Sequence, residues 1–414
     1  MINYFYDCYC ILNKVYSEKT YVKQAISSTF IEEKNRPLTV KTVYGVLDKD
    51  IELSYYIKQL APQTPKLAIR TILKISMYAL KYLEKKEYAV VKNAVELVKK
   101  LGKGGASGFV NAFLHKFINS KIPLPSEIDE KLSILYSFPL FAIKELINVY
   151  GEARTECIIK AQNAKTTLAF YDYDGEKYLT DKGVKFVKTP FKNVFTCDNF
   201  VRNEDFDKGI YTFQALGSVA ICDVVTPSDS LLDCCAAPGG KSIRLSYKFR
   251  HVTSCDIHQH RVELIKSYYT RMRRDNVTAF EMDSKAYNPD FDSKFDAVLC
   301  DAPCSGLGVV NDNPDIKLNR SIEDLVSLNN EQISILNNVC KYVKIGGYLY
   351  YSTCSILESE NINIIKEFLD ANDNFAIEDI DSNLPCEKIL GTVQFLPDVS
   401  GGLGFYVAKL KRVK

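Results

Sequence analysis

Two cysteines that follow apolar segments are the residues of this sequence whose types and positions most clearly suggest a chemical reaction. Cys304 lies in the letters DAPCS at 301–305, and Cys354 lies in STCS at 352–355. A thiolate is a strong nucleophile, and a neighbouring carboxyl group such as that of Asp301 can hold or move a proton. Either cysteine alone is more often a small packing residue. A nucleophilic role therefore requires that the two turns meet in one pocket.

A glycine turn after another apolar segment favours a nucleotide-like ligand. The letters LLDCCAAPGGKS at 231–242 combine strand composition with a turn and a helix start. Such a junction gathers backbone N–H groups and the positive end of a helix dipole at one point. The GxGxxG motif of dinucleotide-binding proteins is absent. Asp256 and Asp283 each end a later extended segment. Either aspartate alone is more often a helix N-cap, but together with the turn they predict an adenosine-type site.

Two thiols beside such a loop predict methyl transfer to carbon 5 of cytosine. This carbon is a poor nucleophile towards a methyl sulfonium. A thiolate that adds to carbon 6 makes carbon 5 enamine-like, so that it can attack the methyl group of S-adenosylmethionine. Asp301 could hydrogen-bond ring N3 and withdraw charge from the adduct. Loss of the carbon-5 proton then lets the thiol leave with help from the second thiol, and the target base must be unstacked or unpaired.

Alternating strand and helix patterns from Lys208 onward would position these residues. Amphipathic helices, for example at 333–343, separate several apolar segments. The strand candidates are 231–235, 251–255, 295–301, 347–352 and 404–410. This alternation predicts an α/β, Rossmann-like domain over 208–414 with a largely parallel sheet. Ligands of such sheets bind beyond the carboxyl ends of the strands, which is where the three motifs fall.

The first 125 residues have the pattern of an all-α domain. Apolar residues recur at helical spacing over 67–83 and 90–98, and the prolines of IPLP at 122–125 end the domain. Residues 126–207 are expected to form linker helices and a small α+β segment. Its expected elements are helices at 142–149 and 156–162 and short strands within 166–173 and 184–195.

Charge is distributed unevenly along the chain. The net charge is +2 for 414 residues, but residues 1–125 carry a net +10 and the remainder carries −8. Residues 58–121 alone hold 13 basic and 3 acidic side chains. A basic module on a mildly acidic body favours an RNA or DNA partner. A lysine-rich, solvated helical surface would explain the charge equally well.

Composition disfavours several classes of protein. No segment approaches the roughly 18 apolar residues of a membrane span, and the start of the chain lacks the basic residues of a secretory signal. The 13 cysteines include no CxxC pair, and zinc-binding spacing is absent. We therefore expect a cytoplasmic monomer with reduced thiols, without a metal and without membrane attachment.

The motifs resemble those of the NOL/NOP/Sun RNA (cytosine-5) methyltransferases. DCCAAPGGK at 233–241, DAPCS at 301–305 and STCS at 352–355 look like the cofactor, Pro-Cys and Thr-Cys motifs of that family. Further likeness lies in NPDIK at 313–317, ESEN at 358–361 and GFYVAKL at 404–410. AVVKNAVELVK at 89–99 and GFVNAFL at 108–114 look like a NusB-type RNA-binding helical domain. The resemblance covers nearly the whole chain.

This resemblance implies a cofactor, a substrate and roles for individual residues. The cofactor would be S-adenosylmethionine, the substrate an unpaired cytosine of 16S rRNA (position 967), and an RRM-like fold would occupy about 130–205. Cys354 would be the nucleophile, Cys304 would assist release of the product, and Asp301 would lie between cofactor and base. The implied cofactor-binding residues are Cys235, Ala236, Ala237, Pro238, Gly239, Gly240, Lys241, Asp256, Asp283 and Asp301.

The sequence departs from the family pattern at three places. Ala215 follows Gln214 where relatives usually have aspartate, and Leu403 stands where an aspartate is common. Asn311 and Asp312 replace a typically basic pair. These departures concern RNA contacts more than the chemistry. Two alternatives stay open: a cytosine-5 methyltransferase in which Cys304 attacks, as in DNA cytosine-5 enzymes, and a non-catalytic RNA-binding protein that has kept the fold.

Overall fold

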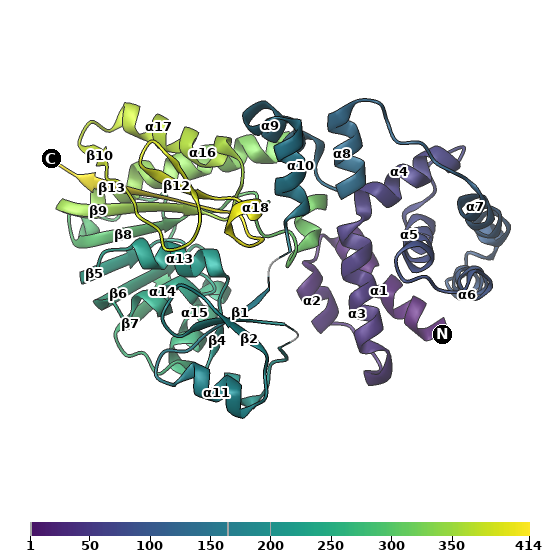
Figure 1. The fold of residues 1–414 in the computed structure, drawn as a ribbon, viewed down its shortest axis with the longest axis horizontal. Coiled ribbons are helices and arrows are strands. Elements are labelled where there is room, and N and C mark those ends of the chain that lie inside the picture. The colour runs from purple at the N-terminus through teal and green to yellow at the C-terminus, as the bar shows by residue number, and fades with distance from the viewer. Residues whose placement is uncertain (1, 164, 199) are drawn as a thin grey trace. The chain divides into compact units, whose positions relative to one another are not determined.

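The computed structural model describes residues 2–163, 165–198 and 200–414, and the chain divides into two compact units (Figure 1). Unit 1 comprises Met1–Ile159 and Val310–Ser321, and unit 2 comprises Lys160–Val309 and Ile322–Lys414. Each unit buries apolar clusters of its own.

Unit 1 is helical in its N-terminal part, as the sequence predicts. Helix α5 packs against α1, α3, α4, α6 and α7, and Ile72, Leu73 and Ile75 on it are fully buried. Gly45 on α3 permits a close approach, because a Cβ atom there would lie 2.0 Å from the ring of Tyr78 on α5. The helices are α1 (Ile2–Glu18), α2 (Val22–Ser27), α3 (Arg36–Asp48), α4 (Asp50–Leu60), α5 (Leu67–Lys81), α6 (Glu87–Lys100), α7 (Ser107–Asn119), α8 (Ile128–Tyr136), α9 (Leu140–Tyr150) and α10 (Glu152–Lys160).

A segment from late in the sequence completes unit 1. The short 3-10 helix Pro314–Leu318 packs on α3. The ammonium of Lys317 is buried and donates to both the backbone oxygen and Oδ1 of Asp48, each at 2.7 Å. Asp315, also buried, accepts a hydrogen bond from the backbone N–H of Val22 at 3.2 Å. The NPDIK letters therefore anchor this segment to the helices.

Unit 2 begins with a small antiparallel sheet. Its strands and helices are β1 (Thr166–Ala169), α11 (Gly175–Asp181), β2 (Phe186–Lys188), β3 (Val194–Cys197), α12 (Glu204–Asp207) and β4 (Thr212–Phe213). The sheet order is β2-β3-β1-β4, and all three pairings are antiparallel. This β-α-β-β-α-β arrangement confirms the small α+β segment and corresponds to the ferredoxin-like motif. The narrower label of an RRM-like fold stays a prediction.

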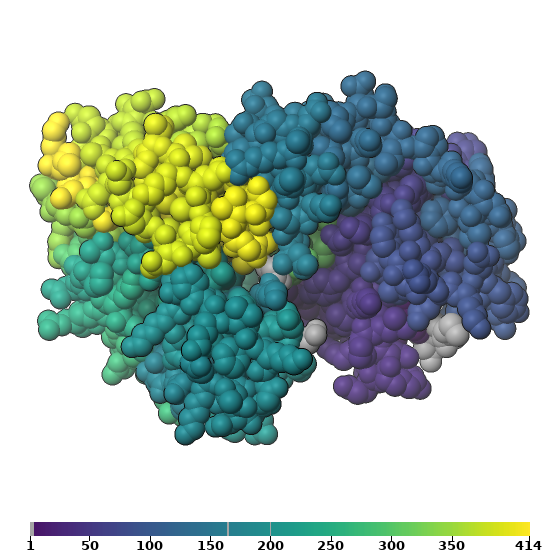
Figure 2. Space-filling model, viewed as in Figure 1, coloured from purple at the N-terminus to yellow at the C-terminus, as the bar shows by residue number. Residues whose placement is uncertain are grey.

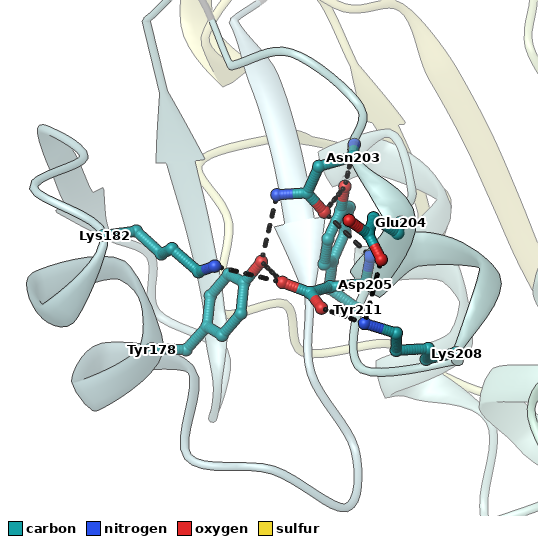
Figure 3. Close-up of polar contacts among 7 residues, drawn as sticks. All are labelled: Tyr178, Lys182, Asn203, Glu204, Asp205, Lys208 and Tyr211. Atoms are coloured by element: carbon teal, nitrogen blue, oxygen red, sulfur yellow. Dashed lines mark hydrogen bonds and ion pairs between the residues drawn. The ribbon is translucent and has the colours of Figure 1, made fainter.

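A polar cluster ties the two helices of this segment together (Figure 3). Tyr178 on α11 donates to Asp205 on α12 at 2.9 Å, and Lys182 lies 3.3 Å from the same carboxylate. Asn203 caps α12 and exchanges hydrogen bonds with Tyr211 at 3.1 Å. Because each member bonds to another part of the same segment, the cluster has a structural role.

A large mixed sheet forms the body of unit 2. Strands β5 to β9 run parallel in the order β9-β8-β5-β6-β7, and β13 is antiparallel to β9. The strands are β5 (Ser228–Asp233), β6 (Phe249–Asp256), β7 (Val277–Glu281), β8 (Phe295–Asp301), β9 (Val343–Thr353), β10 (Phe375–Ile377), β11 (Glu387–Ile389), β12 (Thr392–Phe395) and β13 (Phe405–Arg412). The predicted α/β architecture is thereby confirmed.

Helices cover both faces of this sheet. The clearest evidence is in β5, where Leu231 packs in a cluster with α13 and its neighbour Leu232 packs in another with α16 and α17. The covering helices are α13 (Leu216–Val224), α14 (Gly240–Leu245), α15 (Gln259–Arg271), α16 (Ile322–Val339), α17 (Ile362–Ala371) and α18 (Pro397–Ser400). The chain winds from β5 through β6 to β7 and then resumes on the other side of β5 with β8. Sheets of this kind bind ligands at such a reversal point.

The small sheet and the C-terminal part of the chain adjoin each other within unit 2 (Figure 2). A cavity of about 470 Å³ lies between them. Thr167 and Thr196 of the small sheet line it together with Lys165, Lys188 and the loop at 401–403.

Throughout the described part of the chain, no helix has both the length and the apolar character that crossing a bilayer requires.

Candidate active site

Four neighbouring strands deliver their carboxyl ends to one edge of the large sheet. β5 ends at Asp233, β6 at Asp256, β8 at Asp301 and β9 at Thr353. In the parallel registers, Asp233 pairs with Ser254, and Asp301 pairs with Ser352. The motifs that are far apart in the sequence therefore meet at the β5/β8 reversal point.

The glycine turn follows β5 and starts helix α14, as predicted. Ala236 donates from its backbone N–H to Cys255 at the end of β6 (2.9 Å), and Gly239 donates to Ala236 at 2.7 Å. Gly239 has φ +107°, a conformation that other residues adopt only with strain. A Cβ on Gly240 would meet no atom nearer than 3.9 Å, so the turn leaves space above it.

Lys241 reaches from this turn to Asp301 instead of remaining in the turn. Its Nζ lies 2.6 Å from Asp301 Oδ2, and the hydroxyl of Ser352 donates to Oδ1 at 2.8 Å. Burial lowers the pKa of Lys241, but the Asp301 carboxylate outweighs burial and raises the pKa above its usual value. Lys241 is therefore charged. Spacing in the sequence assigned Lys241 only to the cofactor loop and did not reveal this partner.

The turn after β8, which contains Cys304, and the turn after β9, which contains Cys354, bring their sulfur atoms together. Cys304 Sγ and Cys354 Sγ are 3.3 Å apart, and both side chains are half-buried. The hydrogen bond with Cys354, together with burial and the charge of Glu360, raises the pKa of Cys304 well above its usual value. The two sulfurs are thus close enough to share one proton by a hydrogen bond.

The two aspartates predicted to hold adenosine differ in their surroundings. Asp256 is buried, accepts hydrogen bonds from the backbone of Ala237 and His258, both at 3.3 Å, and pairs with Arg261. Asp283 lies two residues beyond β7, is half-buried, and accepts a hydrogen bond from the backbone N–H of Lys285 at 2.9 Å. Both stand at the ligand-binding edge of the sheet.

Two of the sequence departures, Ala215 and Leu403, fit the fold, and Gln214 next to Ala215 contacts the cofactor turn. Gln214, a residue for which sequence reasoning gave no role, donates to Gly240 O at 3.1 Å and so supports the cofactor turn. Ala215 is the N-cap of α13 and makes no side-chain cap bond, which costs the helix about 1 kcal/mol relative to aspartate. Leu403 is buried in the apolar cluster with Phe405, where it packs.

Metal-binding geometry is not found in the described residues, where no three His, Cys, Asp or Glu side chains are grouped around a common point. Cys235 packs against the apolar cluster that Leu232 of β5 forms with helices α16 and α17. The polar side chains at this edge of the sheet are those of the Lys241–Asp301 pair, the two cysteines, Asp256 and Asp283.

Comparisons with known proteins agree along the whole chain. Residues 223–411 match the family described as 16S rRNA methyltransferase RsmB/F, and residues 8–119 match the NusB family. A Bacillus subtilis (strain 168) protein named probable ribosomal RNA small subunit methyltransferase B is 30% identical over an alignment that covers 97% of this chain and 95% of the relative.

Two solved structures share the fold. The chain titled "Crystal Structure of PH0851" is 19% identical, with a TM-score of 0.85 over 100% of this chain and 99% of that one. NSun6 from Pyrococcus horikoshii with SFG is 18% identical, with a TM-score of 0.58 over 70% of this chain and 98% of that one. Taken with the identity to the Bacillus relative over nearly its full length, these matches place this chain in the RsmB/F (NOL1/NOP2/Sun) family of rRNA methyltransferases with a NusB-type N-terminal domain.

Proposed function

We propose that this protein methylates carbon 5 of a cytosine in 16S rRNA, with S-adenosylmethionine as methyl donor and Cys354 as nucleophile. The observation that carries the proposal is the pair of sulfur atoms 3.3 Å apart, together with the ion pair between Asp301 at the end of β8 and Lys241 at the start of α14. The named relatives are ribosomal RNA small subunit methyltransferases. By family resemblance the target is the cytosine at position 967.

The residues at the sheet edge fit S-adenosylmethionine. The turn at 235–241 offers backbone N–H groups and an open glycine, a suitable surface for the amino-acid part of such a ligand. Asp256 ends β6, and its carboxylate keeps lone pairs that can accept from ribose hydroxyls. Asp283 lies where it can accept from an adenine amino group. When bound, the cofactor supplies an electrophilic methyl group.

The first chemical role falls to Cys354, whose thiolate adds to carbon 6 of the base. The electron pair of the carbon 5–carbon 6 double bond moves toward ring N3, where Asp301 bridges the base to the Lys241 ammonium. That ammonium is the nearby source of a proton for N3 through the carboxyl group. Ser352 fixes the other carboxylate oxygen, so Asp301 is held in one orientation.

Cys304 acts in the second half of the reaction. Once carbon 5 has gained the methyl group, solvent water takes its proton and the carbon 5–carbon 6 double bond re-forms. N3 then returns its proton to the Asp301 carboxylate, and the Cys354 sulfur leaves carbon 6 as a thiolate. Cys304 still holds its proton and lies 3.3 Å from the departing sulfur, so it can stabilise that thiolate by a hydrogen bond. The assignment of the attack to Cys354 rests on the likeness of STCS at 352–355 to the Thr-Cys motif of the family.

RNA binding is supported by features of both units. The NusB match spans residues 8–119, and residues 58–121 hold the excess of basic side chains. In unit 2, Lys165 and Lys188 line the cavity beside the small sheet, which suits a phosphate backbone. We propose that this small sheet is an RRM-like module.

An RNA carrying 5-fluorocytosine tests the roles of the cysteines, because fluorine at carbon 5 blocks the loss of a proton and traps the adduct. We expect a covalent complex with the wild-type protein and with Cys304→Ala, and none with Cys354→Ala. The unsubstituted RNA should also form a persistent complex with Cys304→Ala. The measurement is a denaturing gel of labelled RNA.

The opposite pattern, an adduct with Cys354→Ala and none with Cys304→Ala, would transfer the nucleophilic role to Cys304. Calorimetry with S-adenosylmethionine addresses the non-catalytic alternative, which predicts no binding. The chain's family membership and the retained cysteine pair favour an enzyme over that alternative.

A further inference from the structure

We propose that Glu360 is a positioning residue that sets the distance between the two cysteine sulfurs by binding the serine that follows each cysteine. Its meaning for catalysis rests on the proposed function, whereas the geometry stands without it. Glu360 lies in the ESEN letters at 358–361, outside the three motifs that carry the chemistry.

The carboxylate of Glu360 joins the two turns directly. Ser305, which follows Cys304, donates its backbone N–H to Oε1 at 2.6 Å and its hydroxyl to Oε2 at 2.5 Å. Ser355, which follows Cys354, donates its hydroxyl to the same Oε2. One rigid group therefore holds a turn after β8 and a turn after β9.

The environment of Glu360 is costly for a charge. Its side chain is fully buried, and the donors that hold it are a backbone N–H, two hydroxyls and the amide of Gln332. These neutral groups offset only part of the penalty for removing a carboxylate from water. A buried apolar side chain would stabilise the fold without this desolvation penalty. We therefore attribute the carboxylate to the positioning of the two serines that it binds.

Neighbouring residues reinforce the same turns. Asn361 accepts from the hydroxyl of Thr353 at 2.5 Å and donates to Ser355 O at 3.1 Å. Gln332 donates to Pro303 O at 2.9 Å as well as to Glu360. The residues on either side of each cysteine are thus bonded, and Glu360 is the group shared by both turns.

A proximity measurement on the reduced, full-length protein tests this role without RNA or cofactor. The azo compound diamide takes two protons and two electrons from two thiols, becoming a hydrazine while a disulfide forms. Mass spectrometry of the linked Cys304 and Cys354 peptides gives the rate. We expect Glu360→Ala to slow this cross-link about tenfold, because misplacement of reacting atoms by an ångström has effects of this size or larger.

Graded variants separate positioning from folding. Glu360→Gln keeps one acceptor oxygen and should cross-link at an intermediate rate, and Ser355→Ala removes one arm of the bridge. The matched control is Glu358→Gln, the same substitution in the same short helix, which should cross-link like the wild type. Equal rates in the wild type and all Glu360 variants, or no cross-link in the wild type, would overturn the proposal.

Kinetics supply a second readout that a merely structural role would not produce. Glu360→Gln should lower kcat about 100-fold with unchanged KM for RNA and unchanged binding of S-adenosylmethionine. It should also move the pH profile to lower pH, because the variant lacks a negative charge near Cys304. If the wild-type protein methylates no cytosine, the proposed function fails, and the cross-link still decides the role of Glu360. A uniform loss of cofactor binding and melting temperature would refute positioning.

Discussion

Asp233 shows how a single buried carboxyl group is affected by the cofactor turn above it. It ends β5 and is fully buried; Ser242 donates to Oδ2 at 2.6 Å, while Oδ1 has no hydrogen-bond partner among the described residues. Burial raises the pKa of Asp233 to about 7, and the charge of Asp301 adds to the rise. The hydrogen bond from Ser242 and the charge of Lys241 oppose it only in part.

We predict that Asp233→Asn changes the pH dependence of stability. Because the folded-state pKa lies above the unfolded value of 3.8, the native state binds more protons, so its stability falls as pH rises from about 4 to about 7. The asparagine variant lacks this loss and should gain up to about 4 kcal/mol relative to the wild type above pH 7. Urea unfolding at pH 5, 7 and 8.5 measures the difference, and a difference independent of pH would contradict the prediction.

Residue types allowed part of the site to be predicted. Cys304, Cys354 and Asp301 follow strands that neighbour each other, so their approach could be inferred from the alternating pattern. The partners of Lys241 and Glu360 could not be inferred from the sequence. Long side chains can reach several polar groups, and only the folded structure shows which of these groups lie nearby. The roles proposed for Asp256 and Asp283 stay predictions.

At the level of elements, the two glycines Gly308 and Gly404 let the residue before β13 contact the turn that contains Cys354. Gly404 donates from its N–H to Gly308 O at 2.8 Å, and Gly308 donates to Cys354 O at 2.9 Å. A Cβ on Gly404 would lie 2.1 Å from the Ile356 side chain and 2.8 Å from Gly308 Cα. No side chain fits without moving one of these segments.

Gly404→Ala should therefore destabilise the protein by about 1–3 kcal/mol through overpacking, and should lower kcat because the Cys354 turn is displaced. Thermal unfolding and single-turnover methylation measure the two effects. Gly105→Ala is the control, since a Cβ there meets no atom within 4 Å. Full activity of Gly404→Ala with normal stability would show that the turn does not depend on this contact.

Strong periodicity located the long elements but not the short ones. The predicted strand at 295–301 coincides with β8, and those at 251–255 and 347–352 lie inside β6 and β9. The prediction at 231–235 overlaps β5 only over 231–233. The predictions missed β4, β10, β11 and β12, since strands of two to four residues carry too little alternation to differ from loops. The pairing of β10 and β11 depends on the neighbouring strands β13 and β12.

At the scale of the whole chain, the backbone passes between the two units at 159/160, 309/310 and 321/322. No pattern in the sequence marks Val310–Ser321 as part of the helical unit, because its anchor is an ion pair between the buried Lys317 and the partly exposed Asp48. Deletion of residues 1–125 would leave the Lys317 ammonium without that partner, at a high cost in stability. Substitution of surface charges is therefore the sounder test of RNA binding by unit 1.

The combined replacement of Lys85, Lys86 and Lys92 by glutamine should weaken RNA binding and flatten its salt dependence. All three side chains are exposed, at or before helix α6, within the basic range 58–121. For every phosphate that the variant no longer neutralises, the slope of log K against log salt concentration should become shallower by about 0.7 for single-stranded RNA. The control replaces Lys294, Lys366 and Lys388, three exposed lysines of unit 2. Filter binding at several salt concentrations measures both slopes. A slope in the Lys85, Lys86 and Lys92 variant equal to that of the wild type would mean that these three lysines form an ordinary solvated surface.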